Sequence, residues 1–524
     1  MAVVDASAEN LSDAGRELLR RRLAARAATA RATAGATGPA APAQPATGPV
    51  PLAPAQHRLW FIDRLGAGNL AYNVSAAYRL DGPLDTAALE RALALVVERH
   101  EILRSRVTTT AEGEPLLRTA FSAADIPPAV HDLTNTQDAE DAEDAVDPEA
   151  AAARLAERYA DTAFDLAAGP LLKPWLARLG EHRHILGLTV HHILFDRDSL
   201  DIFSRELSTA YAAFAGETGT PEGPESASPL PPLPAQYADF AREQAAAADA
   251  PDLARRTAAW RERLRGVPPV LELPGDHERP ARPSYRAGEA PVHLPADAAE
   301  KLRALSRERG TTPFVVFLAA FQGLLGRLTA EESLVVGCPF NGRTRVAHEG
   351  LIGFFVNSLP VVGDLTGDPV FTRLVDRTRE ATLAAYDDQD VPFDRIVKAV
   401  DPPRDLSRNP LMQVWFDLAD GGPGGTAPPL ELTGVETAYF GEGRARTRFD
   451  AELHLGTGAD GSVTGRLLYA RDLFEQGTAE SFCSYYTHFL HAVADDPEQR
   501  LSRVPILSGD QLTELLDGWA VAGG

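Results

Sequence analysis

Val190-His191-His192-Ile193-Leu194-Phe195-Asp196-Arg197-Asp198-Ser199 forms the junction between a predicted strand and a predicted helix. The apolar run 185–190 before it predicts a buried strand, and 200–207 predicts the start of an amphipathic helix. Asp198 or Ser199 is expected to cap that helix. Two histidines and an aspartate thus lie where a rigid scaffold ends in an accessible loop, a common place for chemistry.

Three kinds of chemistry compete at this junction with a plain packing role. Metal binding is disfavoured, because His191 and His192 point to opposite faces of an extended strand and no third nitrogen ligand is evident. A nucleophile triad is disfavoured, because there is no G-x-S-x-G and neither Cys338 nor Cys483 lies in a recognisable turn. A histidine acting as base or hydrogen-bond partner in acyl transfer fits best. The spacing of the two histidines and the aspartate is also compatible with histidines that are simply packed in the core.

The composition narrows the class of protein. The 524 residues carry 51 basic and 74 acidic side chains, a formal charge of −23, which disfavours nucleic-acid binding. The first residues predict no signal peptide and no run of about 18 apolar residues occurs, so a cytoplasmic protein is expected. The two cysteines are far apart in sequence, and neither a structural zinc nor a disulfide framework is predicted.

Strands and helices mix along the whole chain, which predicts an α/β (α+β) fold in two lobes. The first lobe is expected to contain a helix over 84–104 and a hairpin of strands 171–179 and 185–190. The second is expected to contain strands at 334–340, within 351–365, at 413–418 and at 461–470, and helices at 370–388 and 474–495. The expected divisions are an N-terminal helix and Ala/Pro linker (1–49), an N-terminal lobe (50–225), a C-terminal lobe (226–505) and a linker (506–524). An acidic insertion is expected at 138–149 and a hinge at 216–234.

Seven short motifs, in order, resemble those of the condensation domains of nonribosomal peptide synthetases, and the resemblance covers roughly 50–515. They are 54–61 (PAQHRLWF), 99–104 (RHEILR), 191–199 (HHILFDRDS), 237–240 (YADF), 352–358 (IGFFVNS), 388–394 (DQDVPFD) and 404–411 (RDLSRNPL).

This resemblance implies two chloramphenicol-acetyltransferase-like lobes in a V, with a central tunnel that carrier-protein arms enter from opposite ends. The implied reaction of secondary-metabolite synthesis is attack by the amine of an acceptor aminoacyl thioester on a donor acyl thioester. Both substrates would ride on phosphopantetheine arms of an upstream and a downstream carrier protein. No cofactor bound by the domain itself is implied.

The resemblance also implies roles for individual residues. His192, the second histidine, matches the active-site histidine of the family, either as proton acceptor or by positioning the amine. Asp196 matches the structural aspartate that pairs with an arginine of the second lobe, for which Arg343 is the candidate. His191 is expected to support the site, and Asn357 is a candidate for the tunnel wall, with a structural role favoured.

Arg197 departs from the family pattern, which has glycine after the aspartate. Arginine adds bulk and charge, and glycine can adopt φ > 0. Arg197 is therefore a candidate for tunnel specificity, and three alternatives stay open: a solvent-facing side chain without effect, specialised chemistry such as a modified residue or ester formation, and an impaired or non-catalytic recruitment domain. The His-His pair disfavours a heterocyclisation domain, and 413–416 (QVWF) disfavours an epimerisation domain. The end of the chain, 501–524, resembles the start of a linker to an adenylation domain.

Overall fold

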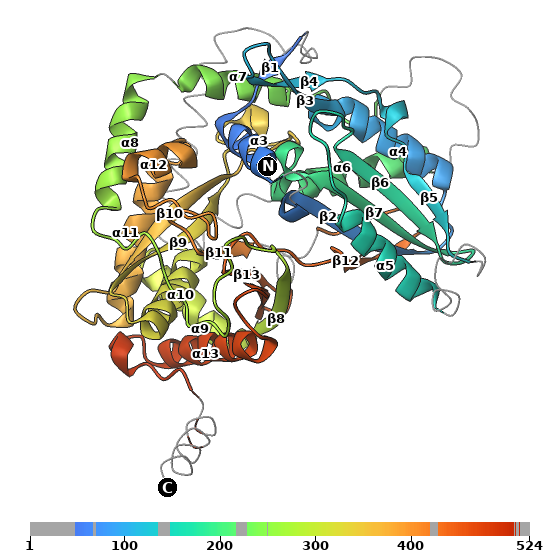
Figure 1. The fold of residues 1–524 in the computed structure, drawn as a ribbon. Coiled ribbons are helices and arrows are strands. Elements are labelled where there is room, and N and C mark those ends of the chain that lie inside the picture. The colour runs from blue at the N-terminus through green and yellow to red at the C-terminus, as the bar shows by residue number, and fades with distance from the viewer. Residues whose placement is uncertain are drawn as a thin grey trace.

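The computed structural model describes residues 48–507 except 67–69, 135–146, 216–227, 249 and 420–427, together with 509 and 513. The expected N-terminal helix and nearly all of both expected linkers lie outside these residues, as do most of the acidic insertion and hinge. Figure 1 shows two lobes side by side, each built on a mixed sheet with helices against it. The α/β (α+β) class in two lobes that the sequence predicts is confirmed.

The N-terminal lobe is organised around strand β7, which ends at the His-His pair. Its five-stranded sheet has the order β12-β2-β7-β6-β5. The strands are β12 (Glu436–Gly441), β2 (Asn73–Asp81), β7 (Arg183–His191), β6 (Leu172–Arg178) and β5 (Ala129–Asp132). The predicted hairpin is the antiparallel pair β6–β7.

Both faces of β7 are covered, which explains its unbroken apolar run. Leu186 and Leu188 belong to the buried cluster that contains the apolar side chains of α4 (Thr86–Arg99) and α6 (Arg197–Phe214). Ile185 packs in a second cluster with Leu155 of α5 (Pro148–Ala160). A small antiparallel sheet, β1-β4-β3, lies beside this lobe. Its strands are β1 (Val50–Pro51), β4 (Pro115–Thr119) and β3 (Ser105–Thr109).

The C-terminal lobe has a six-stranded sheet in the order β10-β9-β11-β13-β14-β8. Its strands are β10 (Asn357–Asp364), β9 (Ser333–Phe340), β11 (Val414–Ala419), β13 (Ala451–Thr457), β14 (Val463–Ala470) and β8 (Ala287–Leu294). Its helices are α8 (Pro251–Arg263), α9 (Ala296–Glu308), α10 (Pro313–Thr329), α11 (Phe371–Asp387), α12 (Phe393–Val400) and α13 (Gln476–Asp495). The four strands and two helices expected here are present. One large apolar core joins the sheet to α10, α11 and α13.

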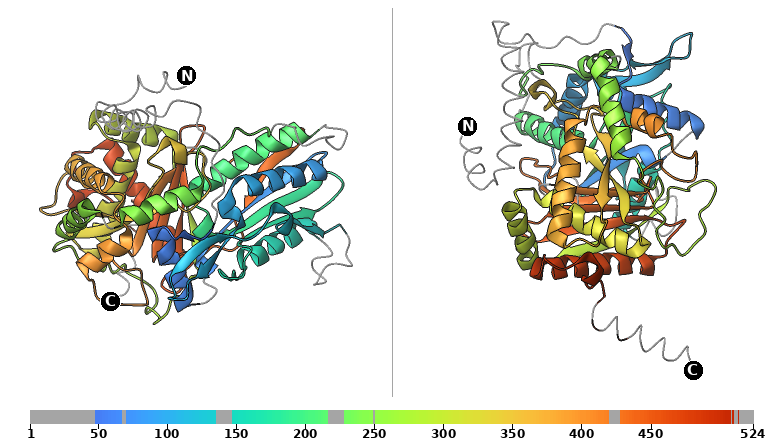
Figure 2. Two further views of the ribbon diagram at one scale, coloured as in Figure 1. Left: turned by 90° about the horizontal axis from the view of Figure 1, so that it is seen from above. Right: turned by 90° about the vertical axis from the view of Figure 1, so that its left-hand side faces the viewer.

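The two lobes share chain segments, contrary to a simple division at 225/226. Strand β12 pairs with β2 in the N-terminal sheet. Helix α7 (Tyr237–Ala247) and residues 351–355 belong to the N-terminal core, whereas α8 belongs to the C-terminal core. Figure 1 shows α7 running across the top of the molecule and α8 running down the outer side of the C-terminal lobe, and Figure 2 shows the same arrangement from two other sides. These crossings place parts of the C-terminal half against the His-His loop.

Among the described residues, no single helix is long and apolar enough to cross a membrane, although α9 and α10 pass that test together as a bent pair.

Candidate active site between the lobes

Asp196 joins the His-His loop to the second lobe. Its carboxylate forms a bidentate ion pair with Arg343, with both nitrogen–oxygen distances 2.8 Å. The backbone N–H of Phe355 donates to the same carboxylate at 3.0 Å. Burial alone would raise the pKa of Asp196, but the charge of Arg343 and these hydrogen bonds lower it below its usual value. The expected pairing with Arg343 is thus present, and it crosses between the lobes.

Asp196 is also the N-cap of α6, which corrects the prediction of Asp198 or Ser199. Its Oδ1 accepts from the backbone N–H and from the hydroxyl of Ser199, at 2.9 and 2.7 Å. The helix therefore begins at Arg197, three residues earlier than the apolar pattern indicated. Asp198 instead accepts a hydrogen bond from Asn341, at the end of β9.

His191 points into the N-terminal lobe. It is 3% exposed, its ring meets Phe164 edge to face, and its Nδ1 accepts from the backbone N–H of Ile193 at 3.1 Å. Burial and the neighbouring His192 lower the pKa of His191 to about 3, so the ring is neutral. These contacts support the loop and leave His191 no access to a substrate.

His192 lies on the other side of the loop, against the segment 351–355. Its Nδ1 is 2.5 Å from the carbonyl oxygen of Phe195, and its ring centroid is 4.8 Å from that of Phe354. A carbonyl can only accept, so Nδ1 carries the proton, and Nε2 of the neutral ring is an acceptor. Nε2 has no hydrogen-bond partner among the residues that the structure describes. Burial and the charge of Arg448 lower the pKa of His192 to about 4.

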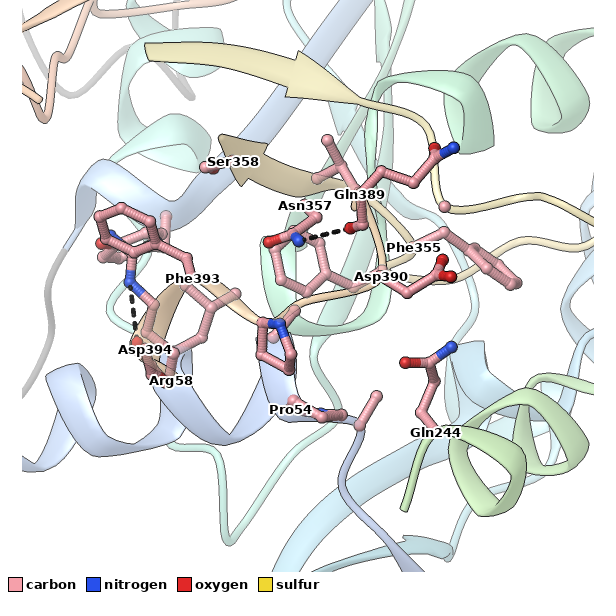
Figure 3. Close-up of a pocket in the computed structure, with 18 of the residues that line it drawn as sticks. Pro54, Arg58, Gln244, Phe355, Asn357, Ser358, Gln389, Asp390, Phe393 and Asp394 are labelled. Atoms are coloured by element: carbon pink, nitrogen blue, oxygen red, sulfur yellow. Dashed lines mark hydrogen bonds and ion pairs between the residues drawn. The ribbon is translucent and has the colours of Figure 1, made fainter. Parts of the chain in front are cut away.

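A pocket of about 920 Å³, open to solvent, lies between the lobes. Phe354, which packs on His192, lines it together with Arg448. Figure 3 shows the part of its wall formed by the start of α3 (Pro54–Leu65), by 355–358 and by 389–394. Its lining combines the rings of Tyr72, Trp415 and Phe449 with polar side chains, and Phe354 connects it to His192.

Asn357 lines this pocket but uses its amide to brace the wall. Its Nδ2 donates to the carbonyl oxygens of Gln389 and Val391, both at 2.8 Å. Figure 3 shows the bond to Gln389, and also the ion pair of Arg58 with Asp394 further along the wall. Both hydrogen bonds lie within the pocket wall, and the structural role of Asn357 stays a prediction.

Arg197 is the first residue of α6 and is half-buried. It is not among the non-glycine residues with positive φ, so its backbone does not require glycine. Its charge acts on Tyr78 of β2 and on Asp417 of β11, in the sheet of the other lobe. Burial raises the pKa of Asp417, and the charges of His454 and Arg197 oppose that rise. Arg197 thus brings positive charge to a half-buried carboxyl between the lobes.

Arg448 and the aromatic lining were missed from the sequence. Phe354 lies inside the motif 352–358 and could have been suspected from it. Arg448 is the last of three alternating arginines (444, 446 and 448) in the coil before β13, and no local pattern distinguishes it from the other two. In the part of the chain that the structure describes, no group of three or more His, Cys, Asp or Glu side chains could hold a metal ion.

The sequence was compared with protein families and curated proteins. The family model for the condensation domain matches residues 46–516. Phosphinothricin tripeptide synthetase PhsC of Streptomyces viridochromogenes is 37% identical over 479 residues, which are 91% of this chain and 42% of that protein. Chondramide synthase cmdD of Chondromyces crocatus is 34% identical over 472 residues, which are 90% of this chain and 11% of that protein. The chain thus spans less than half the length of these relatives.

Solved structures show the same fold. The X-domain from teicoplanin biosynthesis is 32% identical with a TM-score of 0.74, over 90% of this chain and all of that one. The first condensation domain of the calcium-dependent antibiotic synthetase is 22% identical with a TM-score of 0.68, over 88% of this chain and all of that one.

Proposed function

The chain belongs to the condensation-domain family of nonribosomal peptide synthetases, and we propose that it forms an amide bond between two carrier-bound substrates. The donor is an acyl or peptidyl thioester and the acceptor is an aminoacyl thioester. Each rides on the phosphopantetheine arm of a carrier protein, and the domain contributes no cofactor. Relatives that are much longer synthetases support carrier and adenylation domains as its partners. A cytoplasmic location is part of the same proposal.

One observation carries this proposal: the neutral ring of His192, whose Nε2 can accept a hydrogen bond, packs on Phe354, which lines a pocket between the lobes. With a pKa of about 4, His192 is too weak a base to deprotonate an ammonium group. It can accept a hydrogen bond from a neutral amine and hold the lone pair in line with the thioester carbon. It can also take the amine proton once the C–N bond forms, because that nitrogen then becomes far more acidic. Holding two reactants in line contributes up to about 7–11 kcal/mol.

The test is reconstitution with separately loaded donor and acceptor carrier proteins, followed by mass spectrometry of the product still bound to the acceptor carrier. We expect a dipeptidyl product, and His192→Ala to lose at least about 10²-fold in single-turnover rate. His191→Phe is the comparison, because it changes the buried ring alone. Condensation by His192→Ala at the parental rate would remove His192 from the mechanism.

A recruitment role is the second candidate. The X-domain from teicoplanin biosynthesis, 31% identical in its complex with OxyB, supports it. Such a domain would bind a partner enzyme without turnover. If the wild-type protein forms no amide or ester from any loaded carrier pair yet binds a tailoring enzyme, recruitment replaces condensation as its function.

A further inference from the structure

Arg448 stands apart from the other arginines at this site. Arg343 is paired with Asp196, and Arg58 lies 3.8 Å from Asp394. The guanidinium of Arg448 has neither an ion-pair nor a hydrogen-bond partner among the described residues. It lies half-buried over the ring of Tyr72, 5.3 Å from the ring centroid, and lines the pocket. Arg448 therefore brings a positive charge to the pocket wall that the described residues do not neutralise by an ion pair.

The turn that carries Arg448 is held from both sides. The backbone N–H of Arg448 donates to Glu452 at 3.1 Å, and that of Phe449 donates to the hydroxyl of Thr447 at 3.0 Å. Asp450, the next residue, forms an ion pair with Arg279. Burial would raise the pKa of Glu452, but its hydrogen bond from His454 and the charge of Arg448 hold it at about 2. Glu452 thus fixes the backbone of Arg448 and leaves the guanidinium unbound.

The proposed reaction builds negative charge on the carbonyl oxygen of the donor thioester, and Arg448 carries a positive charge in the pocket wall. Attack by the amine forms the C–N bond and pushes the carbonyl π pair onto oxygen. Collapse of this intermediate expels the phosphopantetheine thiolate, which takes up the proton that leaves nitrogen through His192 or solvent. Neutral His192 offers a lone pair to the amine and no charge to the oxyanion. A guanidinium stays protonated in the pocket, and oriented donors at a developing oxyanion are among the largest contributions to acyl transfer.

We propose that Arg448 binds the carbonyl oxygen of the donor thioester and stabilises the oxyanion of the tetrahedral intermediate. This inference rests on the proposed condensation function. In this scheme His192 binds the amine of the acceptor, and Arg448 binds the carbonyl oxygen of the donor. The same proximity explains why Arg448 lowers the pKa of His192.

Arg448→Gln, Arg448→Lys and the wild-type protein form the test, with Arg444→Gln as the matched control. Arg444 lies four residues away, is exposed and pairs with Glu157 outside the pocket. With uncharged donor and acceptor side chains, we expect Arg448→Gln to lose about 10²–10³-fold in single-turnover rate. Arg448→Lys should recover part of that loss, and Arg444→Gln should lose nothing. Thermal unfolding of each variant shows whether a lower rate comes from the lost charge or from a destabilised fold.

A second measurement does not depend on turnover. A phosphonate analogue of the tetrahedral intermediate should bind Arg448→Gln at least about tenfold more weakly, while a neutral thioether analogue binds equally to both proteins. An unchanged rate and unchanged phosphonate affinity would overturn the inference, as would a loss seen only with anionic substrate side chains. If the wild-type protein does not condense, the proposed function fails separately, and the two analogue affinities still decide the role of Arg448.

Discussion

Asp196 and Arg343 meet in a bidentate ion pair that is 3–4% exposed and joins the His-His loop to the other lobe. The carboxylate also caps α6 and accepts from Phe355. The guanidinium stacks on the ring of Phe355 at 4.2 Å and donates to the carbonyl oxygen of Leu351. One carboxylate therefore sets the start of a helix, the loop that carries His192 and the segment that carries Phe354.

Asp196→Asn should destabilise the fold by about 3–5 kcal/mol, because it removes the bidentate partner of buried Arg343 and leaves that charge with the longer contact to Asp198 at 3.5 Å. Urea unfolding followed by circular dichroism measures this. Removal of Glu157, the partner of exposed Arg444, is the matched control and should cost less than about 1 kcal/mol. A loss below about 1 kcal/mol for Asp196→Asn would mean that the pair contributes no more than an ordinary surface contact.

The pH dependence of the rate should follow the protonation of the acceptor amine and not that of His192. The pKa of His192 is lowered to about 4, so the ring stays neutral from about pH 5.5 upward. The rate should then rise with pH as the acceptor amine loses its proton, near pH 7.7–8.0 for an ordinary α-amine (about the reference value). Single-turnover rates between about pH 5.5 and 9 measure this.

An acceptor whose amine has a lower pKa provides the control for that profile. The inflection should move to lower pH with the new amine. An inflection at about pH 6.5 that stays in place when the acceptor changes would instead indicate a titrating histidine.

The parts of this fold that could be predicted are those specified by neighbouring residues. The β6–β7 hairpin and α4 follow from apolar spacing and turn residues within a few positions. Strand β12 could not be found this way, because its side chains are mostly half-exposed and its pairing partner β2 lies more than 350 residues earlier in the sequence. Without β12, β2 would be the edge strand of the N-terminal sheet, and β12 forms by pairing with the backbone groups of that edge.

The residues of the site also differ in whether the neighbouring sequence could predict them. The family motif indicated His192 and Asp196, and Arg343 was the candidate partner because it follows the predicted strand 334–340; the structure brings Asp196 and Arg343 together. The start of α6 was misjudged because Asp196 is held as its cap by contacts with Arg343 and Phe355, which are distant in sequence. Arg448 could not be found, because its position depends on Tyr72 and on the bond between its own backbone and Glu452.

Asn357→Ala should loosen the pocket wall without altering the chemical step. It removes two donors and leaves the carbonyl groups of Gln389 and Val391 without that partner, at a cost of about 1–3 kcal/mol. Hydrogen exchange should quicken over 389–394, and KM for a loaded carrier should rise while the single-turnover rate at saturation is kept. An equal fall in that saturated rate would instead place Asn357 in contact with the reacting groups.

Arg197→Gly and Arg197→Gln should change substrate preference more than stability. The backbone at 197 is ordinary helix, so the fold should lose no more than about 1 kcal/mol. Without this charge, the pKa of Asp417 should rise further, because Arg197 opposes its elevation by burial.

Substrates with an acidic side chain should then lose rate relative to neutral isosteres, since the positive charge between the lobes is gone. Competition between aspartyl- and asparaginyl-loaded carriers, first as donor and then as acceptor, measures the ratio; Arg205→Gln, exposed on the same helix, should leave it unchanged. An identical ratio in the parent and both Arg197 variants would make Arg197 a substitution without effect on selection.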